Sequence, residues 1–378
     1  MPALSPRPRR LAAASVALAA ALCLAAPSAG ALAATSAPRS VFALSAPTSL
    51  ATVDGTLFVA NKTTGTITLL NATTGAFEGL VSHKVLGLSA PSAMAASTGR
   101  TWHTVLVASA GGANRAFAVT KTKSGVSLKA IGTVGLANCA RGAAVSLTTG
   151  AAGQFVALCS NGAIDELSAT TGHLVRALAP AVTGLAGATA LSVVGGAAFV
   201  TVSAARPSPA PAAVAKEGVV EVALSNGKRL GAITNATCSS CGFEGPDGIA
   251  YSGGQLWVAD SLNDQATQLS TGPLAFLGTQ TSNLYGTGAV VATSTAVYLA
   301  SVNGPTSSMV TMFTTKPGTY QWMMCNTNGP YKFDNPSAMA IAATGTVLHP
   351  RVLWVANPAD NLLDEMDATT GALLTTVA

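Results

Sequence analysis

The chain repeats one short strand-like segment seven times, and this repeat limits what it can fold into more than any other feature. The copies are LFVAN at 57–61, VLVAS at 105–109, QFVAL at 154–158, AFVTV at 198–202, LWVAD at 256–260, VYLAS at 297–301 and LWVAN at 353–357. Their central residues are Val59, Val107, Val156, Val200, Val258, Leu299 and Val355, a mean period of about 49 residues. A turn ending in glycine also recurs seven times, at Gly75, Gly125, Gly172, Gly227, Gly272, Gly318 and Gly371. The strand segment and the glycine turn, counted separately, therefore both indicate seven repeat units.

Each unit has room for four strands. In the first unit the strands are expected at 49–53, 56–60, 66–70 and 76–81, with the Asp54-Gly55 pair as a hairpin turn. Four β-strands per period of 40–50 residues are typical of propeller blades, whereas solenoid repeats are usually shorter or helical. The sequence thus predicts an all-β fold, a seven-bladed propeller of four-stranded antiparallel blades over residues 46–378.

Composition fits this architecture and excludes several others. Only 9% of residues are charged, against about 25% in a typical soluble domain. Hydrophobic residues reach 49%, which excludes a disordered chain, and the formal charge of +5 has no basic cluster that would indicate nucleic-acid binding. Sheets packed face to face bury both of their surfaces, which leaves few positions for charge.

The N-terminus has the pattern of an export signal. Three arginines (Arg7, Arg9 and Arg10) precede an apolar stretch at 11–26, and Ala31-Leu32-Ala33 provides a small-x-small cleavage site. We expect residues 1–33 to be removed as a signal peptide, by the general or the twin-arginine route, which lowers the net charge to +2. The mature chain has no apolar run long enough for a transmembrane segment, so we expect it to be secreted or associated with the cell surface. Residues 34–45 form a lead-in, whose segment 40–44 is a candidate closing strand.

The repeat segments resemble a known class of propellers. LWVAN, DATTGALL and the first unit, APTSLATVDGTLFVANKTTGTITLLNATTGA, are similar to bacterial surface-associated repeats of the YVTN and NHL type. The resemblance covers essentially all of the mature chain and implies a propeller scaffold. These motifs describe packing, and one fold hosts many functions.

Long insertions fall in connections expected at one face of the ring, namely 206–218, 237–247 and 324–336. Loops on one side of a rigid ring commonly form a binding surface, and neutral loop growth is the alternative. The polar candidates on these and neighbouring loops are Glu244, Asp247, Asp260, Asn263, Asp264, Tyr331, Lys332, Asp334, Asn335, Asp360 and Asn361. We expect no resident cofactor; the alternative, given these carboxylates and amides, is a divalent cation such as calcium. The expected partner is a protein, a glycan or another cell-envelope ligand.

Five cysteines remain after removal of the signal peptide, and export favours disulfides. Cys139 and Cys159 flank one predicted hairpin and are expected to pair. Cys238 and Cys241 have C-x-x-C spacing, but they lie in a loop rather than at a helix start, so a local structural disulfide is favoured over redox chemistry or zinc. Cys325 is left over, and is either free or paired with a partner that the sequence does not define.

No catalytic constellation stands out, which favours a non-catalytic binding scaffold. The four histidines have no metal or triad spacing. One segment, GPDGIAYSGGQLWVAD at 245–260, resembles a blade of the gluconolactonase family, and this resemblance implies a divalent metal on Asp247. The family's first-strand glutamate and its NGL turn are missing, and the histidine and acids of streptogramin lyases have no counterpart. A metal-dependent lactonase or lyase with Asp247 at the mouth of the central channel is therefore the alternative function.

Overall fold

The computed structural model describes residues 44–82, 87–99, 102–109, 114–122, 125–136, 139, 144–150, 153–178, 185–203, 217–302, 307–316, 318–327, 329–343 and 351–378. The predicted signal peptide lies outside these residues, as do residues 40–43 of the candidate closing strand and most of the 206–218 insertion. Within the described chain there is no helix of the length and hydrophobicity needed to cross a membrane.

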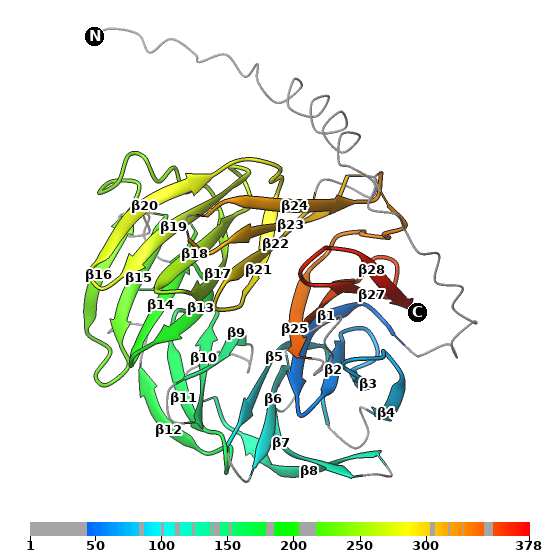
Figure 1. The fold of residues 1–378 in the computed structure, drawn as a ribbon. Helices are drawn as coiled ribbons and strands as arrows, with labels where there is room; N and C mark the ends of the chain where they lie inside the picture. Colours follow the sequence, from blue (N-terminus) through cyan, green and yellow to red (C-terminus); the bar gives the residue numbers. More distant parts are fainter. Residues whose placement is uncertain are drawn as a thin grey trace, which may run out of the picture.

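Seven four-stranded antiparallel sheets are arranged in a ring, which confirms the predicted seven-bladed propeller (Figure 1). In every sheet the strands follow one another in chain order from the axis outward. Blade one contains β1 (Pro47–Val53), β2 (Thr56–Asn61), β3 (Thr66–Asn71) and β4 (Phe77–Val81); blade two contains β5 (Pro91–Thr98), β6 (His103–Ser109), β7 (Asn114–Thr122) and β8 (Gly125–Val134). Blade three contains β9 (Ala144–Thr149), β10 (Gln154–Cys159), β11 (Ile164–Ser168) and β12 (Leu174–Leu178); blade four contains β13 (Ala188–Val194), β14 (Ala197–Val202), β15 (Gly218–Ala223) and β16 (Arg229–Thr234).

The remaining three blades follow the same plan. Blade five contains β17 (Pro246–Ser252), β18 (Gln255–Asp260), β19 (Gln265–Thr271) and β20 (Leu274–Gln280); blade six contains β21 (Thr287–Ala292), β22 (Ala296–Ser301), β23 (Met309–Thr314) and β24 (Tyr320–Cys325). Blade seven contains β25 (Ala338–Ala343), β26 (Arg351–Asn357), β27 (Leu362–Asp367) and β28 (Leu373–Val377). The repeated segment found in the sequence is the second strand of each blade.

The core is divided among the interfaces between blades. Alternate residues of β2 illustrate this, because Leu57 and Val59 pack against blade seven whereas Phe58 and Ala60 pack against blade two. Each of the seven interfaces has its own cluster of buried apolar side chains. A strand that is buried on both faces reads as a continuous apolar run, which explains the low charge of the chain.

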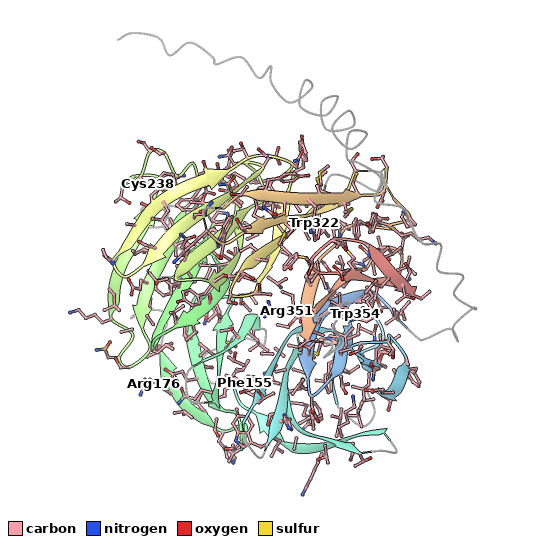
Figure 2. The ribbon with its side chains drawn as sticks, viewed as in Figure 1. Phe155, Arg176, Cys238, Trp322, Arg351 and Trp354 are labelled. Atoms are coloured by element: carbon pink, nitrogen blue, oxygen red, sulfur yellow. A yellow bond between two sulfur atoms is a disulfide. The ribbon has the colours of Figure 1, made fainter. Side chains whose placement is uncertain are left out.

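Blades one and seven complete the ring without exchanging strands within the described chain, since each takes all four strands from one continuous segment. Trp354, fully buried between these blades (Figure 2), donates from Nε1 to the Ala72 carbonyl at 2.9 Å. At the axis, Thr52 Oγ1 donates to the Ile341 carbonyl at 3.0 Å. The joint therefore combines an apolar cluster with hydrogen bonds between the first and last blades.

Candidate functional site

The seven inner strands line an open channel of about 740 Å³ along the axis of the ring. Small apolar and hydroxyl side chains dominate its wall. Asp247 is the only charged residue among the described lining residues, at the start of the blade-five inner strand β17. The channel is therefore a nearly neutral, hydroxyl-bearing cavity with a single carboxylate near one mouth.

Hydrogen bonds between neighbouring blades run along part of this mouth and are here called the belt. In the first six blades the register of the inner strand shifts after its first residue. In blades one, two and four the hydroxyl at the next position reaches the following blade, whereas blade three has Val145 there. Ser337 holds the corresponding place in blade seven, just before β25. Hydroxyls donate to carbonyls in four joints: Thr48 to Pro91 (3.1 Å), Ser92 to Ala144 (3.3 Å), Thr189 to Pro246 (2.6 Å) and Ser337 to Pro47 (3.4 Å). The last of these crosses the joint between blades seven and one.

Asp247 occupies the same belt position in blade five. It is half-buried, and Ser261 Oγ donates to its Oδ2 at 2.7 Å. A carboxylate accepts hydrogen bonds, whereas the belt hydroxyls of blades one, two, four and seven donate them to the next blade. Blade five therefore has an acceptor where those blades have a donor. The structure thus places Asp247 in the channel lining, near one mouth.

Asp260 is fully buried at the end of β18, and its Oδ2 accepts the Glu244 N–H at 2.7 Å. Its Oδ1 is buried, with no hydrogen bond of normal geometry from the residues that the structure describes. Burial raises the pKa of this carboxyl to about 7, although the Glu244 N–H acts in the opposite direction. The carboxyl is directed at the backbone of the 237–247 loop and is not among the residues that line the channel.

Other blades place a structural polar side chain where blade five has Asp260. Asn61, at the end of β2, accepts the Ser45 N–H at 3.0 Å, and Ser109, at the end of β6, accepts the Ser89 N–H at 2.9 Å. All three side chains hold the segment that leads into the inner strand of their own blade. Asp260 is therefore part of a repeated loop support.

Asn263 and Asp264 also support loops. Asn263 Nδ2 donates to the Gly242 carbonyl at 2.5 Å, within blade five. Asp264 Oδ1 accepts the Gly286 N–H at 2.7 Å, which connects blade five to the segment before β21. Asn361 makes the equivalent contact in blade seven, where its Oδ1 accepts the Ala46 N–H at 2.7 Å.

The blade-seven candidates form a second, separate group. Tyr331 is buried, stacks on Phe333 with ring centroids 5.2 Å apart, and donates from its hydroxyl to the Gly371 carbonyl at 2.7 Å. The Lys332 N–H donates to buried Asp364 Oδ2 at 3.3 Å. Asp334 is half-buried, and Asn335 has a left-handed backbone with φ of 60°. Among the described residues, no hydrogen bond or ion pair joins this group to the blade-five candidates.

Two asparagines that the sequence analysis missed hold the long loops. Asn235 brackets the backbone of Phe243, with its Nδ2 donating to the Phe243 carbonyl at 2.6 Å and its Oδ1 accepting the N–H at 2.8 Å. Asn326 does the same to Phe333, with both distances 2.8 Å. Both phenylalanines are buried. The shared F-x-x-P spacing, with Pro246 and Pro336, was the available sequence signal.

The structure contains both predicted disulfides, Cys139–Cys159 and Cys238–Cys241. Among the described residues, Cys139, Cys159 and Asp165 are close enough to share a metal ion, but the two sulfurs are bonded to each other and are not available as metal ligands. Figure 2 shows Cys238 on the outer side of the ring, far from the channel. Cys325, for which a free thiol was one expectation, is disulfide-bonded, and its partner lies outside the described residues.

Only part of the candidate set remains available to a ligand. Glu244, Lys332 and Asp360 have exposed side chains on the loop face, and Asp247 lines the channel. Asp260 and Tyr331 are buried, and Asn263, Asp264 and Asn361 hold backbone groups of loops. The structure brings the blade-five candidates together locally, but it does not gather all eleven residues into one site.

Comparisons with known proteins agree on the fold. A chain of Kuenenia stuttgartiensis hydrazine synthase matches with a TM-score of 0.61 and 13% identity over 90% of this chain and 100% of that chain. The computationally designed Ika8 protein matches with a TM-score of 0.53 and 15% identity over 88% and 87% of the two chains. Saccharomyces cerevisiae Sqt1 matches with a TM-score of 0.52 and 13% identity over 80% and 79%. No family model and no curated protein matches the sequence. At these identities the structural likeness shows a β-propeller and nothing of its activity.

Proposed function

We propose that this chain is an exported, non-catalytic binding propeller that holds a cell-envelope or extracellular ligand on its loop face. The observation that carries the proposal is how the long loops are fixed. The 237–247 and 324–336 loops are each clamped by an asparagine on a buried phenylalanine, which keeps exposed Glu244 and Lys332 on a rigid support. A preorganised surface loses little conformational freedom when it binds.

Two further observations support export and the type of repeat. Two disulfides fit an oxidising environment outside the cytoplasm. The similarity of LWVAN and DATTGALL to bacterial YVTN and NHL-type repeats supports a surface-associated propeller. The N-terminal pattern of residues 1–33 supports the secretory route.

Sedimentation with isolated cell-envelope fragments of the producing organism tests the binding face. Glu244→Gln/Lys332→Gln alters one acid and one base on the loop face, whereas Asp54→Asn/Lys228→Gln alters one of each in turns at the opposite face. The loop-face pair should reduce the bound fraction several-fold, and the control pair should not change it. Equal binding by both variants and the parent would contradict the proposal.

A metal-dependent lactonase- or lyase-like enzyme is the second candidate, because Asp247 lines the channel mouth. A divalent ion held there would supply Lewis-acid chemistry, with Asp247 as its carboxylate ligand. The residues described around it offer hydroxyls and carbonyls rather than further carboxylates. Metal analysis of the purified protein separates the candidates, since Asp247→Ala must remove a bound divalent ion if this alternative holds.

A further inference from the structure

The hydroxyl belt at the channel mouth is interrupted at Val145 in blade three and again between blades five and seven. Asp247 replaces a hydroxyl in blade five, and the next position, in blade six, is Gly288, which has no side chain. A Cβ added to Gly288 would meet nothing within 4 Å, so the space beside it is open. The sector between blades five and seven therefore combines the one charged residue of the described lining with open space.

Hydrogen-bond acceptors in this sector outnumber donors. Ser261 satisfies Oδ2 of Asp247, while Oδ1 receives no hydrogen bond from the residues that the structure describes. The carbonyls of Thr287 and Pro336, which correspond to those capped by hydroxyls in other blades, likewise receive none from described side chains. A charged donor is the complementary partner for such a sector, because charge-assisted hydrogen bonds are the strong ones.

The channel wall beneath the belt is more polar than apolar. The larger apolar residues at this level are buried in the clusters between blades: Leu50, Met94, Leu191, Ile249 and Met339. A ligand that enters at Asp247 therefore meets a wall whose one charged group, among the described lining residues, is the Asp247 carboxylate.

We propose that the channel mouth binds a primary ammonium group, with its NH₃⁺ on Asp247. An ammonium donates three hydrogen bonds, which suits one carboxylate oxygen and neighbouring carbonyls. A calcium ion instead takes six to eight oxygen ligands, commonly with several carboxylates. The site goes beyond the proposed loop-face function, because it uses the channel and none of the exposed loop residues.

Calorimetric titration with hexylamine hydrochloride, with hexan-1-ol as the uncharged control, tests the proposal. Hexylammonium should bind at least about tenfold more tightly than hexan-1-ol, and Asp247→Asn should remove that difference. Asp264→Asn is the matched control, because it alters an exposed carboxylate on the same face that lies outside the channel lining. It should bind hexylammonium like the parent.

Gly288→Ser provides a second variant that tests geometry without changing the charge. Its Cβ has free space and the glycine φ is not left-handed, so the protein should fold normally. The added hydroxyl fills the gap beside Asp247 and should weaken hexylammonium binding several-fold with an unchanged melting temperature. N-acetyl-lysine methylamide, titrated in parallel, distinguishes a lysine side chain of a peptide from a free amine as the natural source.

Three outcomes would overturn the assignment. The first is no binding of either amine up to about 10 mM, which is weaker than a specific site should be. The second is equal affinity for hexylammonium and hexan-1-ol, and the third is unchanged affinity in Asp247→Asn. Displacement of hexylammonium by stoichiometric calcium chloride would instead assign Asp247 to the metal site of the alternative function. None of these results bears on the sedimentation test of the loop face.

Discussion

The side chain of Asn361 accepts a 2.7 Å hydrogen bond from the backbone N–H of Ala46, 315 residues earlier in the chain. This contact connects the β26–β27 turn of blade seven to the segment before β1 of blade one. Asp264 makes the same contact to Gly286 between blades five and six. The same kind of side-chain-to-backbone hydrogen bond therefore joins blade seven to blade one and blade five to blade six.

Asn361→Gly should lower the free energy of unfolding by about 1 kcal/mol, the usual contribution of one such hydrogen bond. Glycine tolerates the φ of 56° at this position, so the effect reports the lost side chain rather than backbone strain. Asn361→Asp keeps the acceptor, as Asp264 does in blade five, and should stay close to the parent. Urea unfolding measures both variants. An aspartate variant as unstable as the glycine variant would contradict this account.

Asp260 should make stability depend on pH. Its pKa is about 7 in the folded protein and about 4 in the unfolded chain, so folding favours the protonated form. Its stabilising contribution is complete below about pH 4 and is lost as the pH rises to about 7, by up to a few kcal/mol. Asp260→Asn, which matches Asn61 in blade one, should remove this pH dependence.

The comparison requires unfolding free energies of both proteins at pH 5, 6, 7 and 8. The difference between Asp260→Asn and the parent should grow in favour of the variant as the pH rises. Buried Glu166 and Asp364, whose pKa values are also raised, remain in both proteins, so they cancel from this difference. A difference that is constant across the series would refute the assignment.

The fold was largely predictable because the second strand of each blade is a contiguous segment with one environment. LFVAN at 57–61 and LWVAN at 353–357 look alike because both strands are buried on two faces. The disulfide Cys139–Cys159 was predictable for a similar reason, since one hairpin brings the two residues to the same edge. Local patterns of this kind do not require knowledge of distant partners.

The roles of the polar residues were not predictable, because they depend on contacts between separate loops. Asp260 and Asn263 looked like loop ligands, yet they hold the backbone at Glu244 and Gly242. A third repeat explains much of this and was missed. A buried apolar residue lies three positions before the first residue of the inner strand in five blades, at Leu44, Leu88, Leu185, Phe243 and Leu284. In blade seven, buried Phe333 lies three positions before Pro336, two residues ahead of β25. The connections from the preceding blade to this apolar residue differ in length. Its spacing from the repeated second strands is therefore irregular, and the repeat is not visible when residues are counted from those strands.

The residue just before the inner strand has a left-handed backbone in five of these blades, and Asn335 has one just before Pro336 in blade seven. In two of the six blades this residue is alanine. Ala90 has φ of 51°, a conformation that costs an L-residue about 1–2 kcal/mol, whereas glycine adopts it freely. Ala90→Gly should therefore stabilise the protein by about 0.5–1 kcal/mol after the entropic cost of glycine. Ala275→Gly, inside strand β20, is the matched control and should destabilise. Thermal unfolding of both variants checks the opposite signs.

Removal of the Asn235 side chain should loosen the 237–247 loop. Asn235→Ala leaves the buried backbone of Phe243 without two partners, at a cost of about 2 kcal/mol. Amide hydrogen exchange of residues 236–244 should accelerate, while exchange of the 326–335 segment should not change. Asn326→Ala should give the reverse pattern. Faster exchange in both loops from either variant would indicate global destabilisation instead of two local clamps.

The two disulfides should differ in what their removal costs. Cys139 and Cys159 are 20 residues apart, whereas Cys238 and Cys241 are three apart. Chain-entropy arguments assign about 3 kcal/mol to the longer loop and about 2 kcal/mol to the shorter one. The longer bridge also lies in the apolar cluster between blades two and three, where alanine replacements leave a small void. Urea unfolding of the Cys139→Ala/Cys159→Ala and Cys238→Ala/Cys241→Ala variants measures the two losses of unfolding free energy. A larger loss from the second pair would contradict this order and would show that the Asn235 clamp on the 237–247 loop depends on the Cys238–Cys241 disulfide.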